Sequence, residues 1–312
     1  MFKLLKKTNH RTKIYSGIFF ALLAAILVGT TNIVGKILVS AEHSDATLHP
    51  LNVVLITSII VGLMFTNTAS KKEPIKNIRK RIFSLIVLMG ILDTSAIVIG
   101  FSGLQHTSAI NASILGDTEI MFGILIAVAI FREKITKKEF LPLIILMTGS
   151  MLIPIGFDLY QNNLSFSASS LGGILIISSA LLYAIDIGIS RYVTRGASSE
   201  RISQIAAFAG FPFALILVII FQIPFHVTLD HIPYILYFGI FIVGLSYYFF
   251  LIALRLIGII KTIVIYSSAS TFGIFFSNVF LGESITEFNI LSVGLIIVGV
   301  YLLRDVLMRI DS

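Results

Sequence analysis

The sequence predicts an all-α membrane protein with ten transmembrane helices, arranged as two inverted repeats of five helices, with both termini in the cytoplasm. Three observations lead to this fold. The 312-residue chain is 56% hydrophobic and only 12% charged, with a mean hydropathy of +0.98. Its apolar residues gather in ten stretches, and its 23 Lys and Arg residues lie almost entirely in alternate gaps between them. Finally, the two halves share short sequence matches in the same order.

The ten apolar stretches are each interpreted as one membrane-spanning helix. Most of them come near the roughly 20 residues that a helix needs to cross a bilayer. The apolar run that follows Lys13 is too long for a signal peptide and lacks a small-residue cleavage site, so it is expected to be retained. In chain order the stretches are residues 14–39, 51–66, 82–104, 107–131, 140–157, 171–190, 202–223, 232–254, 258–281 and 288–303.

The basic residues orient these helices. Lys and Arg occur before residue 14, in 71–81, in 132–138, in 191–201, at Arg255 and Lys261, and in the C-terminal tail. The gaps 40–50, 105–106, 158–170, 224–231 and 282–287 contain neither residue. Short cytoplasmic loops retain Lys and Arg, whereas translocated loops lack them. Both termini are therefore expected in the cytoplasm, and Lys36 is the single exception to the pattern.

Composition also argues against several function classes. The pI near 9.5 arises from cations spread over many loops, so no nucleic acid partner is expected. The chain has no cysteine, which excludes disulfides and thiolate metal sites, and it contains no P-loop or zinc-protease motif. We therefore expect no cofactor, no metal and no enzymatic activity, and a function that lies among the helices of a multi-pass plasma membrane (cell inner membrane) protein.

The two halves match one another weakly but in a constant order. The expected repeats are residues 1–157 and residues 171–312. Because five helices is an odd number, the second copy would enter the membrane upside down, an architecture typical of secondary carriers. The matched positions are Gly17 with Gly172, Lys36 with Arg191, Leu104 with Leu254, and residues 131–136 with 281–286.

Motifs in both halves resemble a known family. Residues 21–36 are similar to the opening helix of EamA-type permeases of the drug/metabolite transporter superfamily, and residues 179–191 resemble its counterpart in the second half. The Gly-Glu-x-hydrophobic-Thr signature of that family is complete in 281–286 and incomplete in 131–136. The resemblance implies a permease that works by alternating access and exports amino-acid-like or other small organic metabolites (efflux). It does not identify the substrate.

Four acids in the apolar stretches are the strongest signal for a functional site. An ionised carboxylate at the bilayer centre costs about 2.5–3.5 kcal/mol even on the most lenient scale, so Asp93, Asp117, Glu119 and Asp186 should avoid lipid. The alternative to a functional role is a protonated acid that holds helices together. On a continuous helix Asp117 and Glu119 point roughly 200° apart, so only one of them is expected to face a shared cavity.

Polar residues at helical spacing extend this site. They occur in the first, sixth and ninth stretches, where small and hydroxyl residues can also serve as ordinary packing contacts. Tyr247 and Tyr248 are open to the same two interpretations, with packing preferred. The candidates for substrate binding or coupling are Asp93, Asp117, Glu119, Asn32, Tyr183, Asp186, Tyr266 and Ser270.

Three further residues are candidates for gating. Lys36 lies near the outer end of the first helix, where it could either snorkel to the headgroups or form an outer gate with an acid such as Glu283 or Glu42. Arg191 would be its counterpart at the inner edge. Asp186 could pair with Arg191 there or take part in gating.

The expected partners are the lipid bilayer and a small-molecule substrate. The intramembrane acids allow proton coupling as one mechanism, and a monomer is a permitted state. An intramembrane aspartyl hydrolase is an alternative function, but its Tyr-Asp and Gly-x-Gly-Asp patterns are absent around Asp186 and Asp117. A membrane scaffold or a channel is a further alternative.

Overall fold

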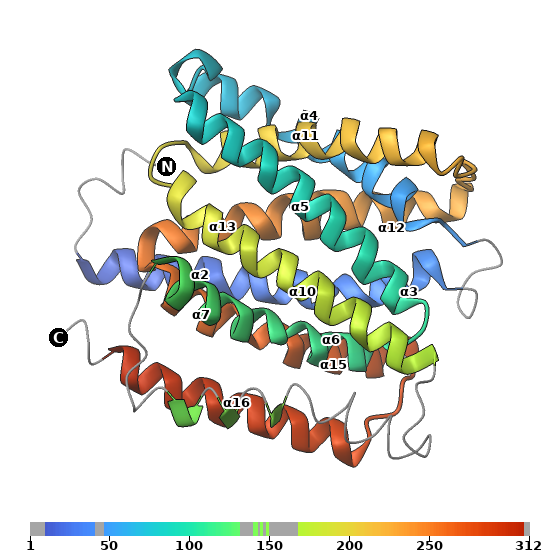
Figure 1. The fold of residues 1–312 in the computed structure, drawn as a ribbon, viewed down its shortest axis with the longest axis vertical. Helices are drawn as coiled ribbons and strands as arrows, with labels where there is room; N and C mark the ends of the chain where they lie inside the picture. The colour runs from blue at the N-terminus through green and yellow to red at the C-terminus, as the bar shows by residue number, and fades with distance from the viewer. Residues whose placement is uncertain are drawn as a thin grey trace.

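A computed structural model describes residues 10–40, 47–131, 140–142, 144–145, 148–149 and 168–308. In these ranges the chain forms helices and their connections (Figure 1). The helices are α2 (His10–Gly29), α3 (Thr31–Val39), α4 (Pro50–Lys72), η1 (Ile75–Asn77), α5 (Lys80–Leu104), α6 (Ala109–Gly116), α7 (Thr118–Phe131), α10 (Ala168–Val193), α11 (Ser199–Ile220), η3 (Leu229–His231), α12 (Ile232–Tyr237), η4 (Phe238–Ser246), α13 (Tyr247–Ile257), α14 (Ile259–Tyr266), α15 (Ser268–Leu281) and α16 (Glu287–Met308).

The long apolar helices confirm that the chain is a multi-pass membrane protein. Six helical segments of the described chain are long and apolar enough to cross a bilayer, and two shorter apolar helices, Ser268–Leu281 and Glu287–Gly299, follow them. The ten-helix count stays a prediction, because most of the fifth stretch, 140–157, lies outside the described residues. In Figure 1, α2 begins and α16 ends at the left of the bundle.

The helices pack in pairs that come from the two halves of the chain. The most extensive contacts join α10 to α5, α4 to α11 and α13 to α2. Two glycines allow the close approach. A Cβ at Gly17 would lie 2.4 Å from the Ile257 side chain at the end of α13. A Cβ at Gly172 would lie 2.8 Å from the Gly103 carbonyl near the end of α5.

Three of the predicted spans are interrupted near their midpoints. The first breaks at Thr30, the fourth at Asp117 and the ninth at Ser267. At each break a hydroxyl donates to the carbonyl three residues earlier, which competes with the regular helical hydrogen bonds. These bonds are Thr30 Oγ1 to Leu27 O, Thr118 Oγ1 to Leu115 O and Ser268 Oγ to Ile265 O, each 2.7 Å long.

The eighth span is also irregular. Residues Phe238–Ser246 form a π-helix between α12 and α13. Such wide turns are rare and recur at functional sites. Four of its residues, Phe238, Ile242, Val243 and Ser246, line the central cavity described below. The irregular segments therefore surround the same interior space.

Candidate functional site

A cavity of about 260 Å³ lies between the two halves, midway along the helices. Ligand pockets in proteins commonly measure about 300–1,000 Å³, so this space lies just below that range and suits only a small molecule. It is lined by the breaks between α2 and α3, α6 and α7, and α14 and α15, together with parts of α4, α5, α10, α11, η4 and α13. The cavity thus forms where the backbone departs from regular helix.

All the residues that the sequence predicts for substrate binding or coupling lie on this cavity. They come from five of the ten predicted spans and meet in one place. The structure brings them together, and their role in binding stays a prediction. The residues are Asn32, Asp93, Asp117, Glu119, Tyr183, Asp186, Tyr266 and Ser270.

The expectation that only one of Asp117 and Glu119 faces the cavity is wrong, because both line it. A helical wheel assumes one continuous helix. Instead α6 ends at Gly116 and α7 begins at Thr118, so Asp117 occupies the break itself. Its ψ of −12° departs from the regular α-helical value, so the regular rotation per residue does not hold across the break.

Asp186 is bound by hydroxyl groups. Its Oδ2 accepts hydrogen bonds from Tyr247 Oη at 3.2 Å and from Ser190 Oγ at 3.4 Å. Within the described part of the chain, Asp186 contacts these hydroxyls and not Arg191, and it lies on the central cavity, only 2% exposed. Tyr247 therefore contributes to the cavity, whereas packing had been preferred for it.

Among the described residues, two buried carboxylate oxygens at the cavity have no hydrogen-bond partner. They are Oδ2 of Asp117 and Oδ1 of Asp186, and both are buried. Asp93 is close enough to Asp186 and Glu119 to interact with them electrostatically. Buried polar atoms in native proteins are nearly always satisfied, so these two oxygens are available acceptors within the site.

Sequence reasoning missed the contributions of four helical segments. Thr57 of α4, Ser203 of α11, Phe238 of η4 and Phe250 of α13 also line the cavity. Isolated hydroxyl or aromatic residues in an apolar span look like packing residues, so their position gave no clear signal. The neighbouring Gly210, whose Cβ would meet Thr94 Oγ1 at 2.5 Å, indicated only close helix packing.

At one end of the bundle, Lys36 is buried rather than exposed to headgroups. It is 5% exposed, and its Nζ donates to the carbonyl oxygens of Thr107 at 2.8 Å and Leu104 at 3.4 Å. Glu283 accepts from the backbone N–H groups of Ala109 and Ile110, both at 2.8 Å. Snorkelling is therefore not the arrangement of Lys36, and Glu42 lies outside the described residues.

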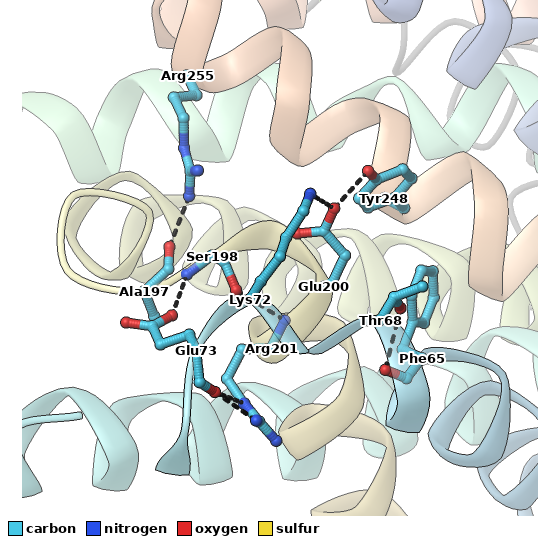
Figure 2. A network of polar contacts seen from close by, with 10 residues as sticks. All are labelled: Phe65, Thr68, Lys72, Glu73, Ala197, Ser198, Glu200, Arg201, Tyr248 and Arg255. Atoms are coloured by element: carbon cyan, nitrogen blue, oxygen red, sulfur yellow. Dashed lines mark hydrogen bonds and ion pairs between the residues drawn. The ribbon is translucent and has the colours of Figure 1, made fainter. Parts of the chain in front are cut away.

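A polar network connects α4, α11 and α13 at the other end of the bundle (Figure 2). We call this the basic end and define it by Lys72, Arg195 and Arg255. Glu200 accepts from Lys72 in an ion pair and from Tyr248 Oη at 2.6 Å. Arg255 donates to the Ala197 carbonyl. This network explains why Tyr248, unlike Tyr247, lies away from the cavity.

Arg201 extends the network into the protein. It is 1% exposed, and its guanidinium donates twice to the Glu73 carbonyl at the end of α4, with Nε at 2.8 Å. The Glu73 carboxylate in turn accepts from Ser198 N–H at 2.7 Å (Figure 2). Arg201 also donates to Gln204. Residues 72–73 and 198–201 are thus tied together at the basic end.

The third gating candidate, Arg191, lies beside this network. It lines a second cavity of about 1,090 Å³ at the basic end, together with Leu254 and Gly258. Leu254 and Gly258 lie 150 positions after Leu104 and Ser108. The same shift of 150 positions aligns the sequence matches between the two halves. Glu133, the counterpart of Glu283, lies outside the described residues.

Comparisons with known proteins agree with this architecture. A solved structure entitled "Crystal structure of protein" shares the fold with a TM-score of 0.69 and 14% identity, over 96% of this chain and 99% of that one. An uncharacterized transporter of Methanothermobacter thermautotrophicus is 26% identical over 92% of this chain and 85% of its own length. One from Clostridium kluyveri is 26% identical over 91% of each chain.

A third relative, the uncharacterized transporter YetK of Bacillus subtilis, is 27% identical over 74% of this chain and 70% of its own length. The strongest assignment comes from a family model. The model of the EamA-like transporter family matches residues 15–154 and 170–304, which together make up most of the chain. This match confirms the resemblance that the sequence motifs indicated. The chain belongs to the EamA-like transporter family.

Proposed function

We propose that this membrane protein is a secondary transporter that exports small organic, amino-acid-like molecules across the plasma membrane by alternating access. One observation carries the proposal: a cavity that holds four acids lies at mid-bundle, surrounded by apolar helices. In carriers of this kind the site near the bilayer centre is formed by interrupted helices. The breaks at Asp117 and Ser267 border this cavity, and 150 residues separate them.

The helix contacts support an internal two-fold repeat, which the odd number of helices in each half would invert. The contact between α2 and α13 joins the first predicted span to the eighth, and the contact between α10 and α5 joins the sixth to the third. If spans 1–5 correspond to spans 6–10, each of these two contacts is the counterpart of the other. The contact between α4 and α11 maps onto itself. Alternating access in such proteins arises when one half rocks against the other around a fixed site.

The proposed orientation places both termini in the cytoplasm, which makes the basic end the cytoplasmic end. The support is the distribution of Lys and Arg along the chain. Reporter fusions test it directly. Fusions at residues 45, 165 and 228 should report the outside, and fusions at 75, 136 and 198 should report the cytoplasm. A reporter on the wrong side at any position would contradict the topology.

Transport itself is tested with purified protein in liposomes. Vesicles preloaded with an unlabelled compound should accumulate the radiolabelled form transiently, in a saturable counterflow that protein-free vesicles lack. The panel consists of amino acids and organic cations. Counterflow requires a binding site that crosses the membrane occupied in both directions. A channel would therefore give uptake without counterflow. A scaffold would give neither, and absence of counterflow for the whole panel would contradict the proposal.

The four acids provide a means of coupling transport to protons. An acid that is neutral in one facing state and ionised in the other carries a proton with or against the substrate. The cavity holds Asp93, Asp117, Glu119 and Asp186 in one space. We therefore propose that the proton gradient drives transport through proton-coupled exchange. A pH gradient imposed across the liposome membrane should then drive uphill uptake.

A further inference from the structure

We infer that the central cavity binds its substrate as an organic cation, through an ammonium or similar group. This inference rests on the proposed transport function and specifies the substrate class of the same site. Four acids line the cavity, namely Asp93, Asp117, Glu119 and Asp186. None of the described residues that line it is Lys, Arg or His. A cation bound there would meet acceptors and no competing positive charge.

Two unpartnered oxygens provide the contact points. Asp117 is 8% exposed and Asp186 is 2% exposed, yet Oδ2 of Asp117 and Oδ1 of Asp186 have no hydrogen-bond partner among the described residues. Leaving a buried acceptor unsatisfied is costly, and an ammonium supplies several N–H donors in a compact group. The two residues come from different halves of the chain, Asp117 between α6 and α7 and Asp186 from α10. A cation between them would therefore contact both halves.

The remaining walls favour an organic rather than an inorganic cation. Aromatic rings attract cations across their faces, and six of them line this cavity. The described residues contain no group of three or more His, Asp or Glu side chains placed to hold a metal ion. Apolar and aromatic surface next to a few acids suits an amine that carries a hydrocarbon body. The rings belong to Phe101, Tyr183, Phe238, Tyr247, Phe250 and Tyr266.

The ends of the protein, unlike the cavity, carry cationic side chains. Lys36 and Glu283 interact with backbone groups around one turn, and the basic end carries Lys72, Arg191 and Arg255. The cavity is therefore the acidic region of an otherwise basic protein, whose net charge is +7. Selectivity for positive charge would thus be exerted at the cavity and not at its approaches.

The experiment compares ligands that share one ring and differ in the charged groups attached to it. Four compounds share a para-hydroxyphenyl ring: tyramine is a cation, tyrosine a zwitterion, para-hydroxyphenylpropionate an anion and para-ethylphenol neutral. Binding of each to the detergent-purified full-length protein is measured by equilibrium dialysis. Tyramine should bind about tenfold or more tightly than the other three, the factor expected for a charge-assisted hydrogen bond. Cyclohexylamine and cyclohexanol provide a second pair of another shape, with the amine again favoured.

Variants locate the effect. Asp117→Asn should lose the preference for tyramine over para-ethylphenol, whereas Asp230→Asn, at an exposed position outside the cavity, should keep it. If Asp117→Asn does not fold, the wild-type ligand series still decides. The inference is wrong if neither amine binds more tightly than its neutral partner, or if Asp117→Asn keeps the full preference.

The outcome is distinguishable from failure of the proposed function. Tyramine that binds selectively without counterflow in liposomes would support the cation site and contradict transport of that ligand class. Counterflow of tyrosine or another zwitterion, with no preference for amines in binding, would support the transporter and overturn the cation site.

Discussion

Lys36 and Glu283 hold the two sides of a single turn, the connection between α5 and α6. Lys36 binds the carbonyl oxygens of Leu104 and Thr107 where α5 ends, and Glu283 binds the N–H groups of Ala109 and Ile110 where α6 begins. Each charge is placed where the helix dipole favours it, the cation at a C-terminus and the anion at an N-terminus. The turn is thereby fixed to α3 and to the α15–α16 connection.

Replacing Glu283 tests this arrangement. Glu283→Gln keeps the size of the side chain but removes the charge, so one favourable dipole interaction of about 0.3–2 kcal/mol should be lost. The apparent Tm of the detergent-purified protein should fall. Glu287→Gln changes an exposed acid in the first turn of α16 and should have a smaller effect. Equal shifts for both variants would mean that the contact with α6 adds no particular stability.

At the basic end, Arg201 should be the residue most important for stability. Arg201→Met removes the donors to the Glu73 carbonyl and to Gln204. A buried hydrogen bond to a charged group contributes about 1.5–3 kcal/mol, so the apparent Tm should fall markedly. Arg195→Met alters an exposed arginine nearby and serves as the control. A Tm for Arg201→Met close to that of the control would show that the network is dispensable.

A pH-dependent change is expected at the start of α4. Partial desolvation lowers the pKa of His49 below its usual 6.5, although the residue is exposed, and its Nδ1 accepts from Leu51 N–H at 3.2 Å. A lowered pKa in the folded state means that this contribution is complete above pH 6.5 and is lost as the pH falls through the lowered value. Protonation would also occupy the accepting nitrogen.

Hydrogen exchange measures this loss. The protection factor of the Leu51 amide should decrease below pH 6.5 in the wild type. In His49→Asn it should stay constant, because Asn caps helices without titrating in this range. His226→Asn, at an exposed position, should leave the wild-type pH dependence in place. A pH-independent protection factor in the wild type would refute the role of His49.

The acids of the cavity are tested by transport. Asp93→Asn, Asp117→Asn and Glu119→Gln preserve shape while removing titration. We expect at least one of them to reach the membrane but to reduce net transport by about tenfold or more, since a charge-assisted contact is lost. A proton-coupled carrier could retain exchange in such a variant. Wild-type rates and unchanged pH dependence in all three would show that these acids only hold the helices together.

Hydropathy and charge patterns were sufficient to predict most of the helices. The third stretch, 82–104, corresponds to α5 (Lys80–Leu104), and the sixth, 171–190, corresponds to α10 (Ala168–Val193). The observed helices extend further because polar residues continue them past the apolar stretch. The breaks at Thr30, Asp117 and Ser267 were not predicted, because no proline marks them. Their signal was a Ser or Thr hydroxyl that binds the carbonyl three residues back.

The candidate site was predictable in part. Acids in an apolar span are costly enough to indicate an interior position, and all four line the cavity. The partners of Lys36 were not predictable, since backbone carbonyls at a helix end carry no sequence signature. Asp117 and Glu119 both line the cavity because the helix is broken between them, and a helical wheel does not include such a break.

Alternating exposure of the cavity is the central claim, and it is tested most directly by thiol labelling. The chain has no cysteine, so Ser267→Cys places one thiol in the cavity, and Ser292→Cys places one at a buried position outside it. A small membrane-impermeant methanethiosulfonate is added to right-side-out and to inverted vesicles. Ser267→Cys should react from either side, transported ligand should shift the ratio of the two rates, and Ser292→Cys should remain unreactive. Reaction of Ser267→Cys from one side only, with and without ligand, would contradict alternating access.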